Sequence, residues 1–143
     1  MSNISKNTPE NEMELLAMDH SGAGELVGYN SSLPGDGTAD CSLTIGPQHM
    51  NRLGILHGGF VAMLLDNGAA LAVRNFARDE ITPAVSVSLS VNYIAGVKSG
   101  TVTATGRITG GGRTLKFAEA ELRDQDGQLL ATASGIFRML DKR

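Results

Sequence analysis

Aromatic residues and cysteine are scarce in this sequence. Its 143 residues include no tryptophan, two tyrosines, four phenylalanines and one cysteine. A single cysteine excludes an intrachain disulfide and fits a reducing compartment. Cys41 falls in a predicted strand with no sign of activation, so we interpret it as a packed or half-exposed thiol and not as a nucleophile.

A strong charge of either sign is also missing. Lysine and arginine number 12 against 15 aspartate and glutamate residues, which gives a net charge of −3. No basic run exceeds the final Asp-Lys-Arg, which argues against nucleic-acid binding through a basic patch. A ligand with several phosphates is still compatible with this composition, because a few local cations and backbone amides suffice to hold one.

Targeting and membrane-spanning signals are lacking as well. Residues 1–16 have neither a basic start nor an apolar stretch, so they do not resemble a signal peptide. The longest apolar segment is too short and too interrupted to span a bilayer. We therefore expect a cytoplasmic protein that does not bind membranes, with a disordered polar segment over residues 1–11 and one domain over residues 12–143.

Hydrophobic patterning predicts an α+β protein. Residues 58–77 are apolar nearly all round, which predicts one long buried helix. A short helix is expected over residues 10–18, and strands are expected over residues 25–32 and 38–46.

The second half of the chain has the alternation of strands. In residues 83–94 every second residue is apolar, which predicts one dry and one polar face; the apolar positions are Val85, Val87, Leu89, Val91 and Tyr93. Three further strands are expected over residues 101–109, 114–124 and 129–140. The glycine-rich separators are typical of hairpin turns. The simplest arrangement is an antiparallel meander wrapped around the single apolar helix.

One carboxylate, Asp66, lies in the middle of the apolar helix. Burying a charge is costly unless it is paired or hydrogen-bonded. Asp66 is therefore either a structural carboxylate bonded to a neighbouring chain segment, or a base or nucleophile shielded from bulk water.

His57, Gly58 and Gly59 precede and open the same helix. The first amides of a helix lack internal partners and attract negative charge, so they can hold a carbonyl oxygen as it becomes an oxyanion. The other interpretation is that the glycines only permit a tight entry to the helix. Gly58 and Asp66 are 8 positions apart, or roughly 12 Å along a helix. If both act on one carbonyl, two copies of the helix must meet in a dimer.

Three segments together resemble the hotdog-fold acyl-CoA thioesterases of the phenylacetic acid degradation (PaaI-like) branch. They are "NRLGILHGGFVAMLLDNGAALA", "AVSVSLSVNYI" and "GGRTLKFAEAELRDQDGQLLATASGIFR". The resemblance covers residues from about 40 to 139. It implies a hotdog fold, in which an antiparallel sheet wraps one central helix, and pairing of two subunits, with a further pairing into a tetramer left open.

The resemblance also implies roles for five residues of the thioester site. Asp66 would be the catalytic carboxylate, and the Gly58 amide of the partner chain would polarise the thioester carbonyl. Asn51 would lie near the thioester, with His57 beside it as a general acid or, as we favour, in a supporting role. Ser86 would position the water or substrate, or be an ordinary polar-face serine.

A coenzyme A site is implied at two glycine-rich places. Gly59 lies at the helix start, and Gly111, Gly112 and Arg113 form a turn that could offer amides and a cation to the phosphates, or be a hairpin turn only. Lys98 and Arg52 are weaker candidates. The three histidines lack ligand-like spacing, so we expect no metal site and no cofactor beyond the substrate's own coenzyme A.

The leading hypothesis is therefore an acyl-CoA thioesterase that forms a homodimer with shared active sites. The alternatives are a non-catalytic acyl-CoA binding or sensing domain on the same fold, and a hotdog dehydratase. Phe60, Met63 and Tyr93 are expected to shape the acyl pocket. Aryl-acetyl, benzoyl and medium-chain acyl groups all agree with the sequence.

Overall fold

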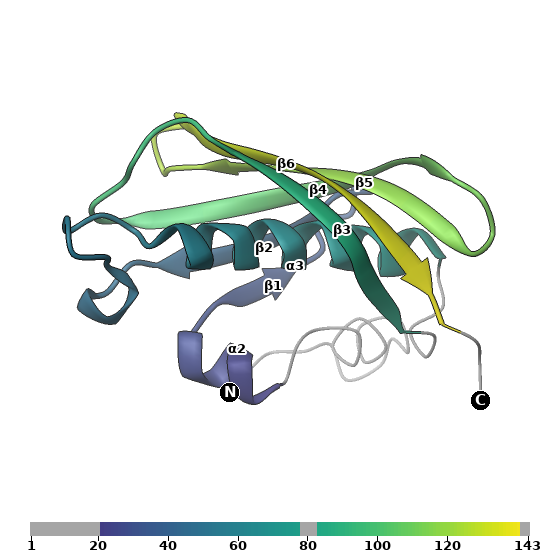
Figure 1. Cartoon of the computed structure of the whole chain (residues 1–143), viewed down its shortest axis with the longest axis horizontal. Helices are drawn as coiled ribbons and strands as arrows, with labels where there is room; N and C mark the ends of the chain where they lie inside the picture. Colours follow the sequence, from purple (N-terminus) through teal and green to yellow (C-terminus); the bar gives the residue numbers. More distant parts are fainter. Residues whose placement is uncertain (1–20, 78–82, 141–143) are drawn as a thin grey trace.

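One antiparallel sheet of six strands curves over a single long helix in the computed structural model, which describes residues 21–77 and 83–140 (Figure 1). The strand order is β1-β2-β4-β5-β6-β3. This confirms the predicted hotdog arrangement. The elements in chain order are α2 (Gly22–Val27), β1 (Asn30–Ser32), β2 (Ala39–Thr44), the 3₁₀ turn η1 (Pro47–His49), α3 (Gly58–Ala77), β3 (Ala84–Tyr93), β4 (Thr101–Gly111), β5 (Leu115–Arg123) and β6 (Leu129–Met139).

The long helix α3 has the predicted bounds but is not buried all round. Its side toward the sheet is inside the core, where Leu64 and Leu65 are fully buried. Met63, Asp66 and Asn67 are half-buried on its other sides. The carboxylate in the apolar segment therefore does not enter the core.

The first part of the chain differs from the expectation. The strand predicted over residues 25–32 is wrong, because Gly22–Val27 is helical and only Asn30–Ser32 is a strand. The Ser21 side chain accepts the Gly24 amide at 3.1 Å, and Gly28 ends the helix at a φ of 87°. A serine cap and a left-handed glycine are helix signals that outweigh the apolar residues between them. The helix predicted over residues 10–18 lies outside the described residues.

The connection between β3 and β4 is a crossover and not the predicted hairpin. β3 pairs with β6, while β4 pairs with β2 and β5. Residues 94–100 therefore pass from one part of the sheet to another over the start of α3. The remaining strands β4, β5 and β6 form the predicted meander. β3 becomes the last strand of the sheet, with one edge unpaired among the described residues.

A β-bulge changes which side chains of β3 face the helix. Ser88 pairs with Ile136 but Ser86 pairs with Phe137, so Val87 is the extra residue. Between Ala84 and the bulge, side chains therefore point to the opposite face of the sheet from the one that the alternation predicts. Val87 and Val85 are 58% and 44% exposed, and the predicted dry face is wrong for these two residues. Bulges of this kind commonly re-aim a side chain next to a functional site.

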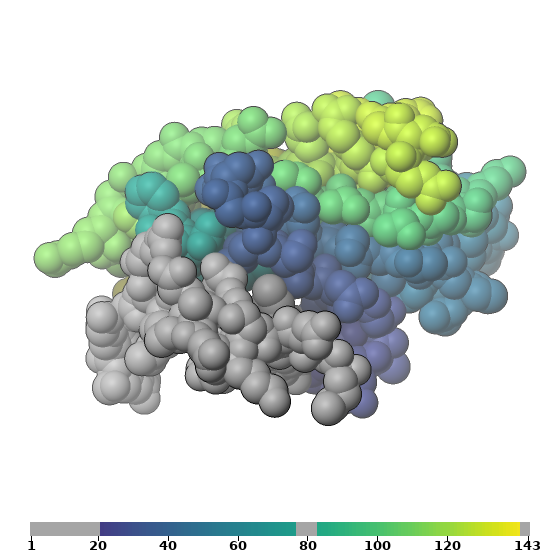
Figure 2. All heavy atoms as spheres, turned by 180° about the vertical axis from the view of Figure 1, so that it is seen from behind, coloured from purple at the N-terminus to yellow at the C-terminus, as the bar shows by residue number. Residues whose placement is uncertain are grey.

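A buried histidine in η1 joins this turn to the end of α2. His49 is 2% exposed. Its Nε2 donates to the Val27 carbonyl at 2.7 Å, and its Nδ1 accepts the Gly46 amide at 2.9 Å. The ring also packs edge-on against Phe60, with 5.4 Å between the ring centroids. Figure 2 shows the molecule from behind, with the dark blue β1–β2 region facing the viewer, on the face opposite to the one that shows β3 in Figure 1.

Among residues 21–77 and 83–140, no helix has the length and apolar character needed to cross a membrane.

The helix and the sheet approach each other most closely at two glycines. A Cβ atom added at Gly106 in β4 would overlap the Gly68 carbonyl in α3. At Gly68 an added Cβ would lie 3.1 Å from the Ala104 carbonyl oxygen. The backbones meet here with no room for side chains, which sets the height of the sheet above α3.

We expect Gly106→Ala to lower the free energy of unfolding by about 1–3 kcal/mol, because α3 must move away from β4. Gly112→Ala is the matched control, since a Cβ there meets nothing within 4 Å; it should change stability by less than about 1 kcal/mol. Chemical denaturation followed by circular dichroism measures both. Equal stability of the two variants would contradict the close contact.

Candidate active site

Among the described residues, the start of α3 leaves one backbone amide without an acceptor. The amides of Phe60 and Val61 donate to the His57 carbonyl, and the Gly59 amide donates to His57 Nδ1 at 2.8 Å. Within the described part of the chain, the Gly58 N–H has no such partner. An amide at a helix N-terminus is a strong donor to a developing negative charge. Gly58 N–H is thus the amide that remains for a ligand.

His57 acts as the cap of this helix. Its carbonyl and its Nδ1 accept the amides of Gly59, Phe60 and Val61. Its ring lies edge-on to Phe60, with 6.0 Å between the ring centroids. Because Nδ1 is an acceptor, Nε2 is the nitrogen that remains for a ligand. This favours the supporting role for His57. The Gly59 amide, expected to contact coenzyme A, is already used by His57.

Asn51 and Gly58 line one cavity of about 360 Å³. Asn51 Oδ1 accepts the amides of Leu53 and Ile55, at 2.9 and 3.3 Å. Its Nδ2 is therefore the donor left for a ligand. Asn51 Nδ2 and the Gly58 N–H are thus two free donors on residues that line the same cavity.

Tyr93 completes this end of the cavity. Its hydroxyl donates to the Gly58 carbonyl at 2.8 Å, and the ring lies within 3.2 Å of where a Gly58 Cβ would be. The sequence indicated Tyr93 only as one of three pocket residues. Phe60 and Met63, the other two, pack against the core and do not line this cavity. The hydrogen bond to Gly58 has no local signal, because 35 positions separate the two residues.

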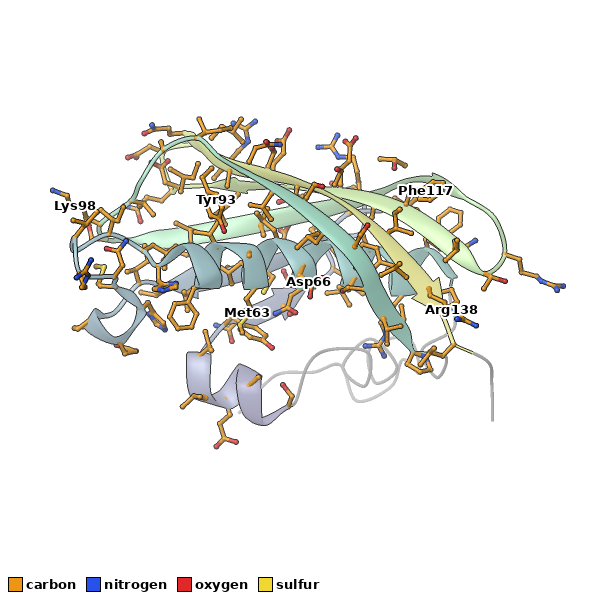
Figure 3. The ribbon with its side chains drawn as sticks, viewed as in Figure 1. Met63, Asp66, Tyr93, Lys98, Phe117 and Arg138 are labelled. Atoms are coloured by element: carbon orange, nitrogen blue, oxygen red, sulfur yellow. The ribbon has the colours of Figure 1, made fainter. Side chains whose placement is uncertain are left out.

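Asp66 and Ser86 form a second polar group. The Ser86 hydroxyl donates to Asp66 Oδ1 at 2.6 Å. The contact joins the middle of α3 to β3, which crosses the helix there (Figure 3). The bulge at Val87 turns Ser86 toward the helix. In the part of the chain that the structure describes, Asp66 has no cation beside it, so its second oxygen is available to a ligand or to water.

The two polar groups do not meet within one chain. Gly58 and Asp66 lie in the same helix, roughly 12 Å apart along its axis. The structure thus brings Asn51, His57 and Gly58 together, and Asp66 and Ser86 together, as two separate half-sites.

The glycine-rich turn lies at the other end of the sheet from the cavity. β4 runs from Thr101, beside the cavity loop, to Gly111 at the turn, over 11 residues. This is roughly 35 Å at the rise of a strand. Gly111, Gly112 and Arg113 are exposed, whereas Lys98 is at the cavity end (Figure 3). Arg52 is exposed in the loop before α3.

No group of three or more histidine, cysteine, aspartate or glutamate residues that could hold a metal is found among the described residues.

Comparison with known proteins gives one family. Residues 53–131 match the sequence profile of the thioesterase superfamily. The mouse protein acyl-coenzyme A thioesterase 13 is 36% identical over 93 residues, which are 64% of this chain and 65% of the mouse protein. The match thus spans slightly less than two thirds of that relative.

Solved structures give the same fold. The conserved protein PA5202 from Pseudomonas aeruginosa is 32% identical, with a TM-score of 0.80, over 88% of this chain and 98% of its own. The PaaI protein from the phenylacetic acid degradation operon of E. coli is 20% identical, with a TM-score of 0.76, over 85% of this chain and 86% of its own. The likeness to the E. coli protein concerns the fold alone.

The cap at His57 leads to a stability prediction. His57→Ala removes the side-chain acceptor of the Gly59 amide, and we expect it to lower the free energy of unfolding by about 1 kcal/mol. His57→Asn restores an acceptor that is well suited to a helix start, so most of this stability should return. Denaturant titration of the two variants tests this. A loss of the same size in both would show that the ring, and not the cap, is what stabilises the helix start.

Proposed function

The chain belongs to the thioesterase superfamily, and on this basis we propose that it hydrolyses an acyl-CoA to a free acid and coenzyme A, with an aromatic or medium-chain acyl group. The observation that carries the proposal is the pair of half-sites. One offers two donors for a carbonyl oxygen, and the other offers a carboxylate held by a serine. These are the two functions that acyl transfer to water requires.

The donors fit the developing oxyanion of a thioester. The carbonyl oxygen would accept from the Gly58 N–H and from Asn51 Nδ2, which are left over from the hydrogen bonds of this region. When the carbonyl carbon is attacked, the oxygen gains negative charge and both bonds become stronger. Collapse of this intermediate breaks the carbon–sulfur bond, and the coenzyme A sulfur takes up a proton.

Asp66 supplies the nucleophile in one of two ways. It removes a proton from the attacking water and returns this proton to the leaving sulfur, or it attacks the carbonyl carbon itself, and water then hydrolyses the resulting anhydride to the free acid and the carboxylate. Ser86 holds Asp66 Oδ1, so Oδ2 would face the reacting carbon or its water. Asp66 is partly buried and has no cation beside it among the described residues. This supports the role, since no fixed charge in that part of the chain competes for the carboxylate.

A dimer would unite the half-sites. β3 is an edge strand of 10 residues with exposed Val85 and Val87, and an edge of this kind is a template for pairing with another chain. If two copies of β3 pair antiparallel about a two-fold axis, the Tyr93 end of one strand lies beside the Ser86 end of the other. The Gly58 amide of one subunit would then face Asp66 of its partner.

The same pairing supports the coenzyme A assignment. It would bring the cavity end of one subunit toward the end of the other subunit that carries Gly111, Gly112 and Arg113. Their exposed amides and guanidinium could bind phosphates there. The Gly59 amide is used by His57, so Gly59 would not donate a hydrogen bond to coenzyme A. It would instead let coenzyme A come close to the backbone, because glycine has no side chain.

We expect Asp66→Asn to lower kcat for acyl-CoA hydrolysis by about 10²–10⁴-fold, as loss of a general base does. Ser86→Ala should cost about 10–100-fold through loss of a hydrogen bond to a charged group. Ser90→Ala is the matched control, because Ser90 is on the same strand and pairs with exposed Ser134 on the outer face of the sheet. Thiol release is the measurement, and unchanged turnover in Asp66→Asn would remove Asp66 from the mechanism.

Removal of the Gly58 amide tests the oxyanion site. Gly58→Pro deletes the N–H at the first position of a helix, where proline is well tolerated, and kcat should fall by about 10²–10³-fold. Gly58→Ala is the control, since it adds a Cβ near Tyr93 but keeps the N–H. Its kcat should fall less than that of Gly58→Pro.

Mixing the variants tests the shared site. Neither Gly58→Pro nor Asp66→Asn has an intact site alone, but a mixed dimer has one. Random exchange of subunits should therefore restore about a quarter of wild-type activity. No recovery after verified exchange would place each complete site within one subunit.

A further inference from the structure

Building on the proposed hydrolysis of acyl-CoA, we infer that the cavity beside Gly58 is the acyl pocket, and that it selects medium-chain or single-ring acyl groups without polar substituents. Its polar side chains are Asn51 and Tyr93, both at the end near Gly58. The side chains that line the remainder and carry this argument are aliphatic: Ile55, Val61, Ile94, Val97, Leu122 and Leu130.

The chemistry of the lining decides which arm of the thioester enters. With the carbonyl oxygen on Gly58 N–H and Asn51, one substituent of the carbonyl carbon extends into the cavity. The pantetheine arm carries amides and a hydroxyl, and burial among aliphatic side chains would leave these without partners, which is costly. The acyl chain has no such groups, so it is the arm that enters.

The floor of the cavity limits the length of the acyl group. Leu122 and Leu130 are 0% and 2% exposed and belong to the core, so the floor does not yield. A volume of about 360 Å³ is near the lower end for small-molecule sites. This volume suits a medium chain or one aromatic ring better than a long fatty chain.

Ile55 forms a wall that can be changed. It is half-buried in the loop before α3, and its Cδ1 lies 3.1 Å from where a Gly96 Cβ would be. The two loops that carry Ile55 and Gly96 are therefore in contact, and together they form one wall of the cavity. Leu53 is in the same loop as Ile55, is 80% exposed and does not line the cavity, which makes it a matched control.

The experiment compares kcat/KM for butanoyl-, hexanoyl-, octanoyl-, decanoyl- and palmitoyl-CoA, with phenylacetyl- and 4-hydroxyphenylacetyl-CoA as the ring pair. For the wild-type protein we expect a rise of about fourfold for each methylene that fits and a fall at palmitoyl. The ring hydroxyl should cost about 10–100-fold, because the floor offers it no partner. Equal or better turnover of palmitoyl or of the hydroxylated ring would overturn the inference.

Variants of the wall then separate the pocket from the chemistry. Ile55→Ala should raise the ratio of kcat/KM for decanoyl- over hexanoyl-CoA by about tenfold, and Ile55→Phe should lower it by a similar factor. Leu53→Ala should leave it unchanged. Ile94 also lines the cavity and is 55% exposed, so Ile94→Ala should raise the same ratio. This variant replaces the Ile55 variants in the test if they fail to fold. If the wild type hydrolyses acyl-CoA but the folded lining variants keep the wild-type ratio, the acyl-pocket inference is refuted and the proposed function is not. If the wild type hydrolyses no acyl-CoA, the proposed function itself is refuted.

Discussion

The rigidity of α3 is the constraint on which the candidate site depends. Gly58 and Asp66 are both part of this helix, and the rise of a helix holds them roughly 12 Å apart. The helix fixes the direction of the Gly58 amide. No change of side-chain rotamer therefore lets Asp66 of the same helix reach a carbonyl that is bound to this amide. The proposed thioester site, in which Gly58 and Asp66 act on one carbonyl, therefore needs a second copy of the helix. The edge of β3 that is unpaired among the described residues is where such a copy can be added to the sheet.

Small backbone features place the polar groups around this helix. The contact between Gly68 and Gly106 sets the sheet close above α3. The bulge at Val87 then turns Ser86 onto Asp66, while Tyr93, beyond the bulge, reaches the Gly58 carbonyl. Both half-sites are thus held between α3 and the same strand. Movement of β3 would disturb both of them together, which couples the edge of the sheet to the proposed chemistry.

Much of the fold follows from local patterns in the sequence. The bounds of α3 and the four long strands agree with the predicted segments to within a few residues, because helical composition and alternation are properties of neighbouring residues. Errors arose where a local pattern had two interpretations. Residues 25–32 include apolar residues that fit a strand, but the cap at Ser21 starts a helix that continues to Val27. The alternation of β3 hides a bulge, since one extra residue changes no local preference.

The sequence alone indicates the candidate residues for the chemistry: a carboxylate in an apolar helix, and a His-Gly-Gly helix start, of which the Gly58 amide has no partner among the described residues. It also determined that these groups are too far apart to act within one helix. The tertiary structure, by contrast, places β3 at the sheet edge, brings Ser86 to Asp66, and puts Leu122 and Leu130 in the lining of the cavity beside Gly58. These are contacts between segments far apart in the chain, and the pattern of either segment alone contains no information about its partner.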